Sequence, residues 1–362
     1  MFNRRFIPIW LGIVIALFGL AAMAQTAQAA PAAPIDIPMT QPDGTPFTAR
    51  QWGDEWLHGY ETVDGYTIIQ VEDGSWVYAA LGADGALTPV RQDGQMLLAG
   101  KDTPPSQASQ ARPSLPADAP SRELPSGGPL LAHNTGTERV LMVMVNFLNR
   151  TRTYNPVTVF LPKFFGASSS IRDFYLDASF NALTLEPAIE TYSTIGSAND
   201  GLIEVTLNMN HPSNTNESRT IAAAAYNAVN PYINFASYDT DGDGYVSGKE
   251  LHFIMIIAGY EESYGGCITP CIWGHQWNLA SPLLLDGVYV GTSSADGDYG
   301  GYAMFGEIHY DHAATIGIMV HEMGHNLTWP DLYDTDGGSE GVGEWSIMGS
   351  ASWNGMTYPG DT

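Results

Sequence analysis

The sequence predicts an α+β protein in which a small β-rich domain precedes a larger domain with a mixed sheet and helices. Three observations predict this architecture. Asp-Gly pairs recur between residues 40 and 95, a segment rich in proline, serine and alanine follows, and the rest of the chain mixes strand-like and helix-like patterns without a regular β-α-β alternation. With 362 residues, the chain is long enough for more than one domain. We expect a leader at residues 1–29, a β-rich domain at 30–100, a linker at 101–137 and the larger domain at 138–362.

The N-terminus has the pattern of an export signal. Two arginines precede an apolar run over residues 6–22, and an Ala-Gln-Ala tripeptide at 27–29 offers a cleavage site before Ala30. A membrane anchor is the alternative, but the run is short for a ~20-residue span and a cleavage site follows it. We predict a secreted protein without stable membrane association after cleavage.

The acidic composition limits the partners. The formal net charge is -25, from 39 acidic and 14 basic residues. A surface of this sign repels phosphate backbones and anionic lipid headgroups. The composition therefore argues against nucleic acid and membrane surfaces as partners.

The β-rich domain is predicted from turn chemistry. Asp-Gly tolerates the positive φ angles of tight hairpin turns, and runs such as YTIIQV and SWVYAAL between the pairs are rich in β-branched and aromatic residues. In the linker, large apolar residues are scarce, so we expect an exposed segment in which Arg112 and Arg122 are open to proteases. A small domain, a cleavable tether and a large domain are the layout of a zymogen.

The larger domain contains five predicted elements. VLMVMVNF at 140–147 is short, apolar and rich in valine, which predicts a buried strand, and ELHFIMIIAGY at 250–260 predicts an internal strand. SSSIRDFYLDASF at 168–180 begins with serines that can cap a helix. Alanines favour a helix over RTIAAAAYNAV at 219–229, and IHYDHAATIGIMVHEMGHNL at 308–327 is the last predicted helix.

That last helix contains HEMGH, in which His321 and His325 are four residues apart. This spacing places both side chains on one face, so both can bind one zinc ion at ~2.1 Å. Glu322 falls beside them without ligating, close enough to take a proton from a water molecule that zinc activates. The alternative is a core helix whose histidines have main-chain partners. However, the preceding TIGIMV is wholly apolar, and a polar cluster with an acid is costly there unless something organises it.

The segment after this helix offers a third ligand. Pro330 is expected to end the helix and turn the chain, which lets Asp331 return toward the metal. The pattern HExxHxxxxxD is typical of a zincin peptidase. Three other acids could take the third place: Asp334, Glu340 and Glu344. WSIMGSASW follows at 345–353 and places Met348 where metzincins have a methionine turn beneath the zinc ligands.

Residues 239–250, DTDGDGYVSGKE, match the calcium-loop pattern D-x-D-x-D-G-x5-E. The predicted ligands are Asp239, Asp241, Asp243, the main-chain carbonyl of Tyr245, Ser247 directly or through water, and Glu250. A strand-like segment follows instead of an EF-hand helix, which favours a structural Ca²⁺ over a calcium sensor. A solvated acidic loop is the alternative.

The two cysteines, Cys267 and Cys271, lie in CITPC. In an exported protein this spacing predicts a local disulfide. A CxxxC zinc site would need further ligands nearby, and His275 alone is not enough.

Together, the blocks QPDGTPFTARQWGDEW, DTDGDGYV, HEMGHNLTWPDLYD and GEWSIMGSASW resemble the M6 family of secreted bacterial metallopeptidases, the immune inhibitor A type. The resemblance implies a metzincin-like catalytic domain behind a propeptide, with zinc on His321, His325 and Asp331 and with Glu322 as the base. Thr328 departs from the family pattern, which usually has glycine after the helix; a β-branched residue at positive φ is strained. The chain also stops soon after the methionine turn, which predicts a fragment or a truncated product.

We therefore predict a secreted zinc endopeptidase that is made as a zymogen and stabilised by calcium. The β-rich region has no cysteine that could bind the zinc, so Asp54 or His58 of GDEWLH is predicted to block the site. The alternative is a secreted calcium-dependent binding or surface protein with a structural or inactive zinc site. Glu322 opposes this alternative, because a structural zinc site needs no base.

Overall fold

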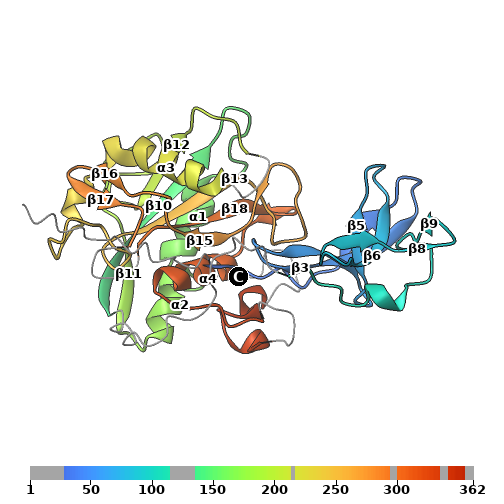
Figure 1. Ribbon diagram of the computed structural model, residues 1–362. Coiled ribbons are helices and arrows are strands. Elements are labelled where there is room, and N and C mark those ends of the chain that lie inside the picture. Colours follow the sequence, from blue (N-terminus) through green and yellow to red (C-terminus); the bar gives the residue numbers. More distant parts are fainter. Residues whose placement is uncertain (1–27, 115–134, 213–216, 294–299, 335–340, 355–362) are drawn as a thin grey trace, which may run out of the picture.

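The computed structural model describes residues 28–114, 135–212, 217–293, 300–334 and 341–354. A small antiparallel sheet lies beside a larger domain in which helices cover both faces of a mixed sheet (Figure 1). Most of the predicted leader and the central part of the predicted linker fall outside the described residues. Within the described ranges, no helix combines the length and the apolar character needed to cross a membrane.

The small sheet has the hairpin turns that the Asp-Gly pairs predict. Its strands pair antiparallel in sequence order: β2 (Ile37–Thr40), β3 (Pro46–Gly53), β4 (His58–Thr62), β5 (Thr67–Gln70), β6 (Trp76–Leu81) and β7 (Leu87–Pro89). A two-stranded ribbon of β8 (Arg91–Gln92) and β9 (Gln95–Met96) follows. The glycines of the five pairs have φ between 79° and 90°. A glycine adopts such angles at no steric cost, and the preceding aspartates Asp43, Asp73 and Asp84 accept hydrogen bonds from the amide two residues on.

Residues 101–112, the first part of the predicted linker, pack on the small sheet and do not form an exposed segment. The segment includes the short 3-10 helix η1 (Ser106–Ala108). Arg112 pairs with Glu61 and lies over the Trp52 ring, with its guanidinium carbon 4.1 Å from the ring centroid. Composition missed this packing because a cation–π contact and ion pairs need few apolar residues. The last two residues of the predicted linker, 136 and 137, belong to the strand β10 (Gly136–Asn146).

The large sheet is built around two long buried strands. Its order is β1 (Gln28–Ala29), β15 (His275–Trp277), β18 (Tyr302–His309), β13 (His252–Glu261), β10 (Gly136–Asn146) and β11 (Leu183–Pro187); β12 (Leu202–Thr206) also pairs with β10, β14 (Cys271–Ile272) with β13, and β19 (His312–Ala313) with β18. The central pairs are parallel, whereas β1, β15 and β19 pair antiparallel with their neighbours. The sheet is therefore mixed, as predicted.

Helices form a layer on each face of this sheet (Figure 1). The helices α1 (Pro156–Phe165), α2 (Ile171–Ala178) and α4 (Ile316–Asn326) pack on one core, and α3 (Ser218–Val229) packs on the other. Side chains along β10 alternate between the two cores: Leu141 and Val143 face α3, whereas Met142 and Met144 face the other three helices. Ser170 caps α2 by accepting a hydrogen bond from the Asp173 amide, as its sequence predicts.

Helices connect parallel strands twice, from β10 through α1 and α2 to β11 and from β12 through α3 to β13, although the order of elements is not a regular β-α-β alternation. One expectation about the larger domain was wrong. The last helix is shorter than residues 308–327, because β18 runs to His309 and a turn at Tyr310, with φ of 48°, leads into β19. Residues 308–313 form a short hairpin whose polar tip, His309 to His312, has no strand alternation that separates it from the helix in the sequence.

Candidate metal centre

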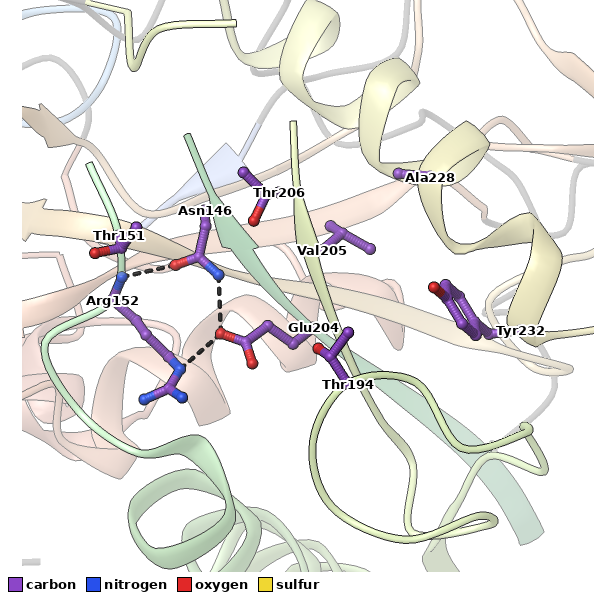
Figure 2. A pocket seen from close by; sticks show the side chains of 9 residues that line it. All are labelled: Asn146, Thr151, Arg152, Thr194, Glu204, Val205, Thr206, Ala228 and Tyr232. Atoms are coloured by element: carbon purple, nitrogen blue, oxygen red, sulfur yellow. Dashed lines mark hydrogen bonds and ion pairs between the residues drawn. The ribbon is translucent and has the colours of Figure 1, made fainter. Parts of the chain in front are cut away.

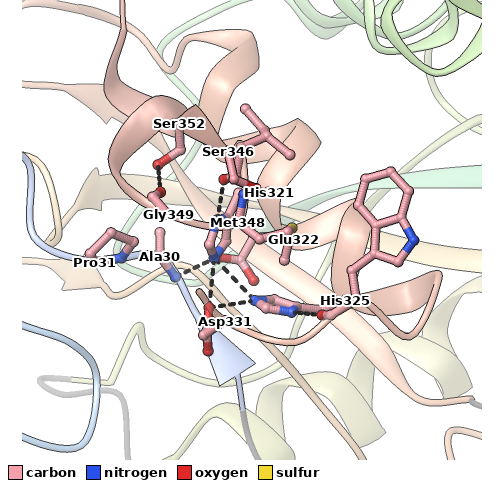
Figure 3. Close-up of polar contacts among 12 residues, drawn as sticks. Ala30, Pro31, His321, Glu322, His325, Asp331, Ser346, Met348, Gly349 and Ser352 are labelled. Atoms are coloured by element: carbon pink, nitrogen blue, oxygen red, sulfur yellow. Dashed lines mark hydrogen bonds and ion pairs between the residues drawn. The ribbon is translucent and has the colours of Figure 1, made fainter. Parts of the chain in front are cut away.

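The C-terminal half of α4 presents three polar side chains to one point. His321, Glu322 and His325 have no exposed surface. The Nε2 atoms of the two histidines are 3.0 Å apart, as the four-residue spacing predicts (Figure 3).

Main-chain carbonyls fix the protonation of both imidazoles. His321 Nδ1 donates to the carbonyl oxygen of Ile347 at 2.8 Å, and His325 Nδ1 donates to that of Trp329 at 2.8 Å. A carbonyl oxygen can only accept, so each Nδ1 carries a hydrogen and each Nε2 keeps a lone pair. Both histidines therefore point a free donor atom at the same place, which is how a metal-binding histidine is oriented.

Asp331 completes the group. Its Oδ1 lies 3.2 Å from His321 Nε2 and 3.3 Å from His325 Nε2. The three residues form a set whose ligand atoms lie within 4.8 Å of one another and could hold a metal ion. Of the rival acids, Asp334 is not in this set, Glu344 is exposed in η5 (Gly343–Trp345), and Glu340 lies outside the described residues.

The turn that returns Asp331 to the helix differs from our expectation. The helix ends at Asn326, before Pro330, so the proline does not stop it. Instead, Thr328 adopts a φ of 71°, and the Trp329 amide donates to the Gly324 carbonyl at 3.0 Å. This is the left-handed helix ending that usually requires glycine, and here a threonine carries its strain.

The donor set fits a tetrahedral divalent ion. Two neutral imidazole lone pairs and a carboxylate oxygen that face each other repel unless a cation lies between them. Donors at ~2.1 Å from a tetrahedral zinc ion would lie about 3.4 Å apart, close to the observed 3.0, 3.2 and 3.3 Å. The residues present therefore suit zinc, and three ligands leave one position for another molecule.

Met348 packs against α4 at Gly324, which lies between the two histidines in sequence. Its side chain is buried, and a β-carbon added at Gly324 would lie 2.5 Å from its sulfur. Its carbonyl oxygen accepts a hydrogen bond from the Leu332 amide at 2.7 Å, and the preceding Ile347 carbonyl holds His321. The segment around Met348 thus contacts both the helix and the returning segment.

The family comparison decides the identity of this domain. The model of the immune inhibitor A peptidase M6 catalytic domain matches residues 170–361, more than half of the chain. The chain belongs to the M6 peptidase family. The match includes α4, Asp331 and the methionine turn.

Two curated relatives place the M6 domain among bacterial proteins. The pre-pro-metalloprotease PrtV of Vibrio cholerae serotype O1 is 35% identical over 142 residues, which are 35% of this chain and 15% of that protein. Immune inhibitor A of Bacillus thuringiensis subsp. alesti is 33% identical over 140 residues, which are 35% of this chain and 19% of that protein. The matched stretches thus span less than a fifth of either relative. No solved structure matches the chain.

The charges in the M6 site depend on burial. Burial, together with the negative charge of Asp331, raises the pKa of Glu322 well above its usual value. Burial also works to raise the pKa of Asp331, but His325 and His321 outweigh it and bring that pKa to about 2. Burial lowers the pKa of His325. These shifts favour an ionised Asp331 and a neutral His325, which are the forms that bind a metal.

A segment near the N-terminus lies across the M6 site, which the sequence did not predict. The Ala30 amide donates to Glu322 Oε1 at 2.9 Å (Figure 3). Trp273 Nε1 donates to the Ala30 carbonyl at 2.8 Å, and Trp353 Nε1 donates to the Pro31 carbonyl at 2.8 Å. Further along, the Ala33 amide donates to the Ser263 carbonyl at 2.7 Å. We call residues 30–33 the strap.

The two side chains predicted to block the site have other contacts. Asp54 Oδ1 accepts hydrogen bonds from the amides of Trp56 and Leu57, so it caps its own turn. The His58 ring stacks on Trp273, with centroids 4.6 Å apart. Neither Asp54 nor His58 belongs to the three-residue metal set.

The predicted calcium loop brings its acids close together. Asp239, Asp241 and Asp243 form a second set of ligand atoms within 4.8 Å of one another. Glu250 turns back into the loop, where Oε1 accepts from the Thr240 amide at 2.6 Å and Oε2 from the Ser247 amide at 2.9 Å. The main chain at Tyr245 bridges to Tyr289 of β17 (Val288–Val290), and β13 follows the loop, so the loop is attached to strands on both sides.

The cysteines form the predicted disulfide between Cys267 and Cys271, with their Cα atoms 5.4 Å apart. Glu262 lies close to both sulfurs. Because the thiols are used in the disulfide, these three residues do not make a metal site.

A separate cavity of about 730 Å³ opens at the carboxyl ends of β10 and β12 (Figure 2). Its lining residues are Asn146, Thr151, Arg152, Thr194, Glu204, Val205, Thr206, Ala228 and Tyr232. Glu204 Oε1 accepts from Arg152 Nε at 2.6 Å and from Asn146 Nδ2 at 2.9 Å. The cavity contains none of the predicted metal ligands, and its central polar groups pair with one another, so we do not assign it to the site.

Proposed function

We propose that this chain is the precursor of a secreted zinc endopeptidase, in which His321, His325 and Asp331 hold the metal and Glu322 is the general base. The observation that carries the proposal is the convergence of three free donor atoms on one point beside a buried glutamate. Membership of the M6 family and the printed name of the Vibrio relative, a metalloprotease, support it.

A zinc ion held by these residues would polarise the scissile carbonyl and make a water molecule more acidic. Glu322 would carry out the proton transfers. Glu322 Oε2 is buried and accepts no hydrogen bond within the described part of the chain, so it can take the proton from water. Its burial favours the protonated form, so the carboxyl can hold that proton and then give it to the leaving nitrogen.

An extended peptide would fit beside β15. The pair of residues before the strap already forms a short strand here: Ala29 pairs with His275 and Gln28 with Gln276, both antiparallel. Main-chain pairing of this kind binds a polypeptide with little regard to its side chains. We infer that a protein substrate binds along β15 with its scissile bond next to Glu322.

The strap supports the zymogen part of the proposal. Its Ala30 amide uses Glu322 Oε1, and its carbonyls are held by two buried tryptophans, Trp273 and Trp353. A substrate cannot bind the same groups while the strap is present. We infer that cleavage in the 115–134 region, or of the strap itself, must release this segment before the enzyme becomes active.

We also propose that the 239–250 loop binds one structural Ca²⁺. Hard oxygen ligands from Asp239, Asp241 and Asp243 are already gathered, and Glu250 is oriented toward the loop. Like charges held this close repel one another, so a cation would stabilise the loop and the strands attached to it.

Hydrolysis and zinc content, measured together, test the proposed function. The full-length precursor is processed with a protease, and casein hydrolysis is followed before and after zinc removal and after zinc is restored. Wild type should hold one zinc and lose activity reversibly, whereas Glu322→Gln should keep its zinc and hydrolyse nothing. A wild type that binds zinc but leaves casein intact would favour the binding-protein alternative, and an active Glu322→Gln would remove Glu322 from its role.

A further inference from the structure

Glu261 is a buried carboxylate that the proposed chemistry does not use. It is the last residue of β13 and is 1% exposed. Its Oε1 accepts from the Ser263 amide at 3.1 Å, the Ser263 hydroxyl at 2.7 Å and the Gly274 amide at 2.8 Å. Its Oε2 accepts from the Gly306 amide at 2.8 Å. A carboxylate is costly to bury without such donors, so this arrangement needs a reason.

The four donors come from three separate segments. Gly306 belongs to β18, beside the point where the β13–β18 register shifts after Ile257. Gly274 connects β14 to β15, and Ser263 lies in the turn after β13. One carboxylate thus joins the centre of the sheet to its edge.

Two of these segments are the ones that hold the strap. Trp273, directly before Gly274, donates to the Ala30 carbonyl, and His275, directly after it, pairs with Ala29. The Ser263 carbonyl accepts from the Ala33 amide. A shift of Gly274 or Ser263 would therefore move the groups that position a polypeptide against Glu322.

The helix α4 packs closely against Gly274. A β-carbon added at Gly274 would lie 2.6 Å from Cδ1 of Ile318, three residues before His321 on α4. A β-carbon at Gly306 would lie 2.5 Å from the main chain of Tyr260. Gly274 is thus fixed between the Glu261 carboxylate and the helix, with no room for a side chain.

We propose that Glu261 is a positioning residue, which holds Gly274 and Ser263 so that β15 presents an extended polypeptide at the correct distance from Glu322. It acts through these two residues and is not a catalytic residue. The proposal rests on the proposed function, because it assumes that the substrate binds along β15. Burial disfavours the ionised form of Glu261 and raises its pKa to about 7. Keeping this carboxylate in the sheet therefore lowers the stability of the protein.

The first test uses the full-length precursor and does not depend on activity. Glu261→Gln is nearly the same size, but its amide nitrogen would face an N–H donor. Hydrogen exchange of the Ala33 amide, which remains an amide after leader removal, should be at least tenfold faster in this variant than in wild type, with an unchanged zinc content. Glu262→Gln, the same change one position away, should match wild type. Unchanged exchange in Glu261→Gln would overturn the proposal.

The second test uses the processed protein. Glu261→Gln should lower kcat/KM at least tenfold on a long peptide, mainly through KM, and much less on a peptide too short to pair with β15. Equal losses on both substrates, with a lower melting temperature, would show a general structural role and overturn the proposal. If Glu261→Gln does not fold, Ser263→Ala replaces it and should show the same pattern at about threefold, because one hydroxyl donor is lost. If the wild-type protein hydrolyses nothing, only the proposed peptidase function is refuted. The role of Glu261 is then still decided by the hydrogen-exchange test, which needs no activity.

Discussion

Replacing Thr328 with glycine should stabilise the protein. Thr328 lies in the turn after α4 with φ of 71°, and its side chain makes no hydrogen bond within the described residues. For a residue with a β-carbon, this left-handed conformation costs ~1–2 kcal/mol, which glycine avoids. Glycine loses more conformational freedom on folding than threonine does, which lowers the free energy of unfolding by ~0.5–1 kcal/mol. The net gain in the free energy of unfolding is therefore about 0.5–1 kcal/mol.

Thermal unfolding of the full-length precursor measures this gain. A domain of this size shifts by roughly 2–4 °C per kcal/mol, so Thr328→Gly should melt about 1–4 °C higher than wild type. Thr328→Val is the matched control, because it keeps the β-branch and should show no gain. Zinc content should be the same in all three proteins, since the turn already delivers Asp331 to the histidines. A Thr328→Gly protein that melts at or below the wild-type temperature would refute the assigned strain.

Three further predictions follow from particular contacts. Trp353→Phe removes the hydrogen bond to the strap at Pro31, which contributes ~1 kcal/mol. Basal activity of the unprocessed precursor should therefore rise about fivefold. The same change at Trp345, which is 96% exposed, should have no effect. Calcium should raise the melting temperature of wild type but not of Asp241→Asn, and equal responses would contradict a site in the loop. The pKa of Glu261 is raised from 4.5 to about 7, so its contribution to stability is present below pH ~4.5 and lost as pH rises through ~7. Urea denaturation at pH 5 and pH 8 should show wild type losing up to ~3 kcal/mol more than Glu261→Gln, and parallel pH profiles would contradict the shift.

Local patterns predicted the elements of the fold better than their arrangement. The Asp-Gly turns, the two long strands at 140–147 and 250–260, and the capped helix after Ser170 are all present, because each depends on neighbouring residues. The parallel order of the strands was not predicted, since pairing partners are far apart in the chain. The end of β18 and the strand β19 were taken for part of a helix, because their short polar hairpin is too brief to show a strand alternation.

The metal set could be predicted because its chemistry lies in the side chains and its spacing is short. His321, His325 and Asp331 fall within eleven residues, and the structure brings all three together. The strap could not be predicted, because it acts through main-chain atoms of small residues and its contact with Glu322 spans 292 positions in sequence. Glu261 has no motif at all; only the donors that surround it reveal its place.

The most direct test of the metal centre is a crystal structure of the zinc-loaded precursor, with anomalous scattering measured on both sides of the zinc edge. We predict one zinc peak within about 2.1 Å of His321 Nε2, His325 Nε2 and an oxygen of Asp331, with no fourth ligand from a protein side chain. A zinc ion bound by four side chains, or a peak away from these three residues, would contradict the proposed catalytic site.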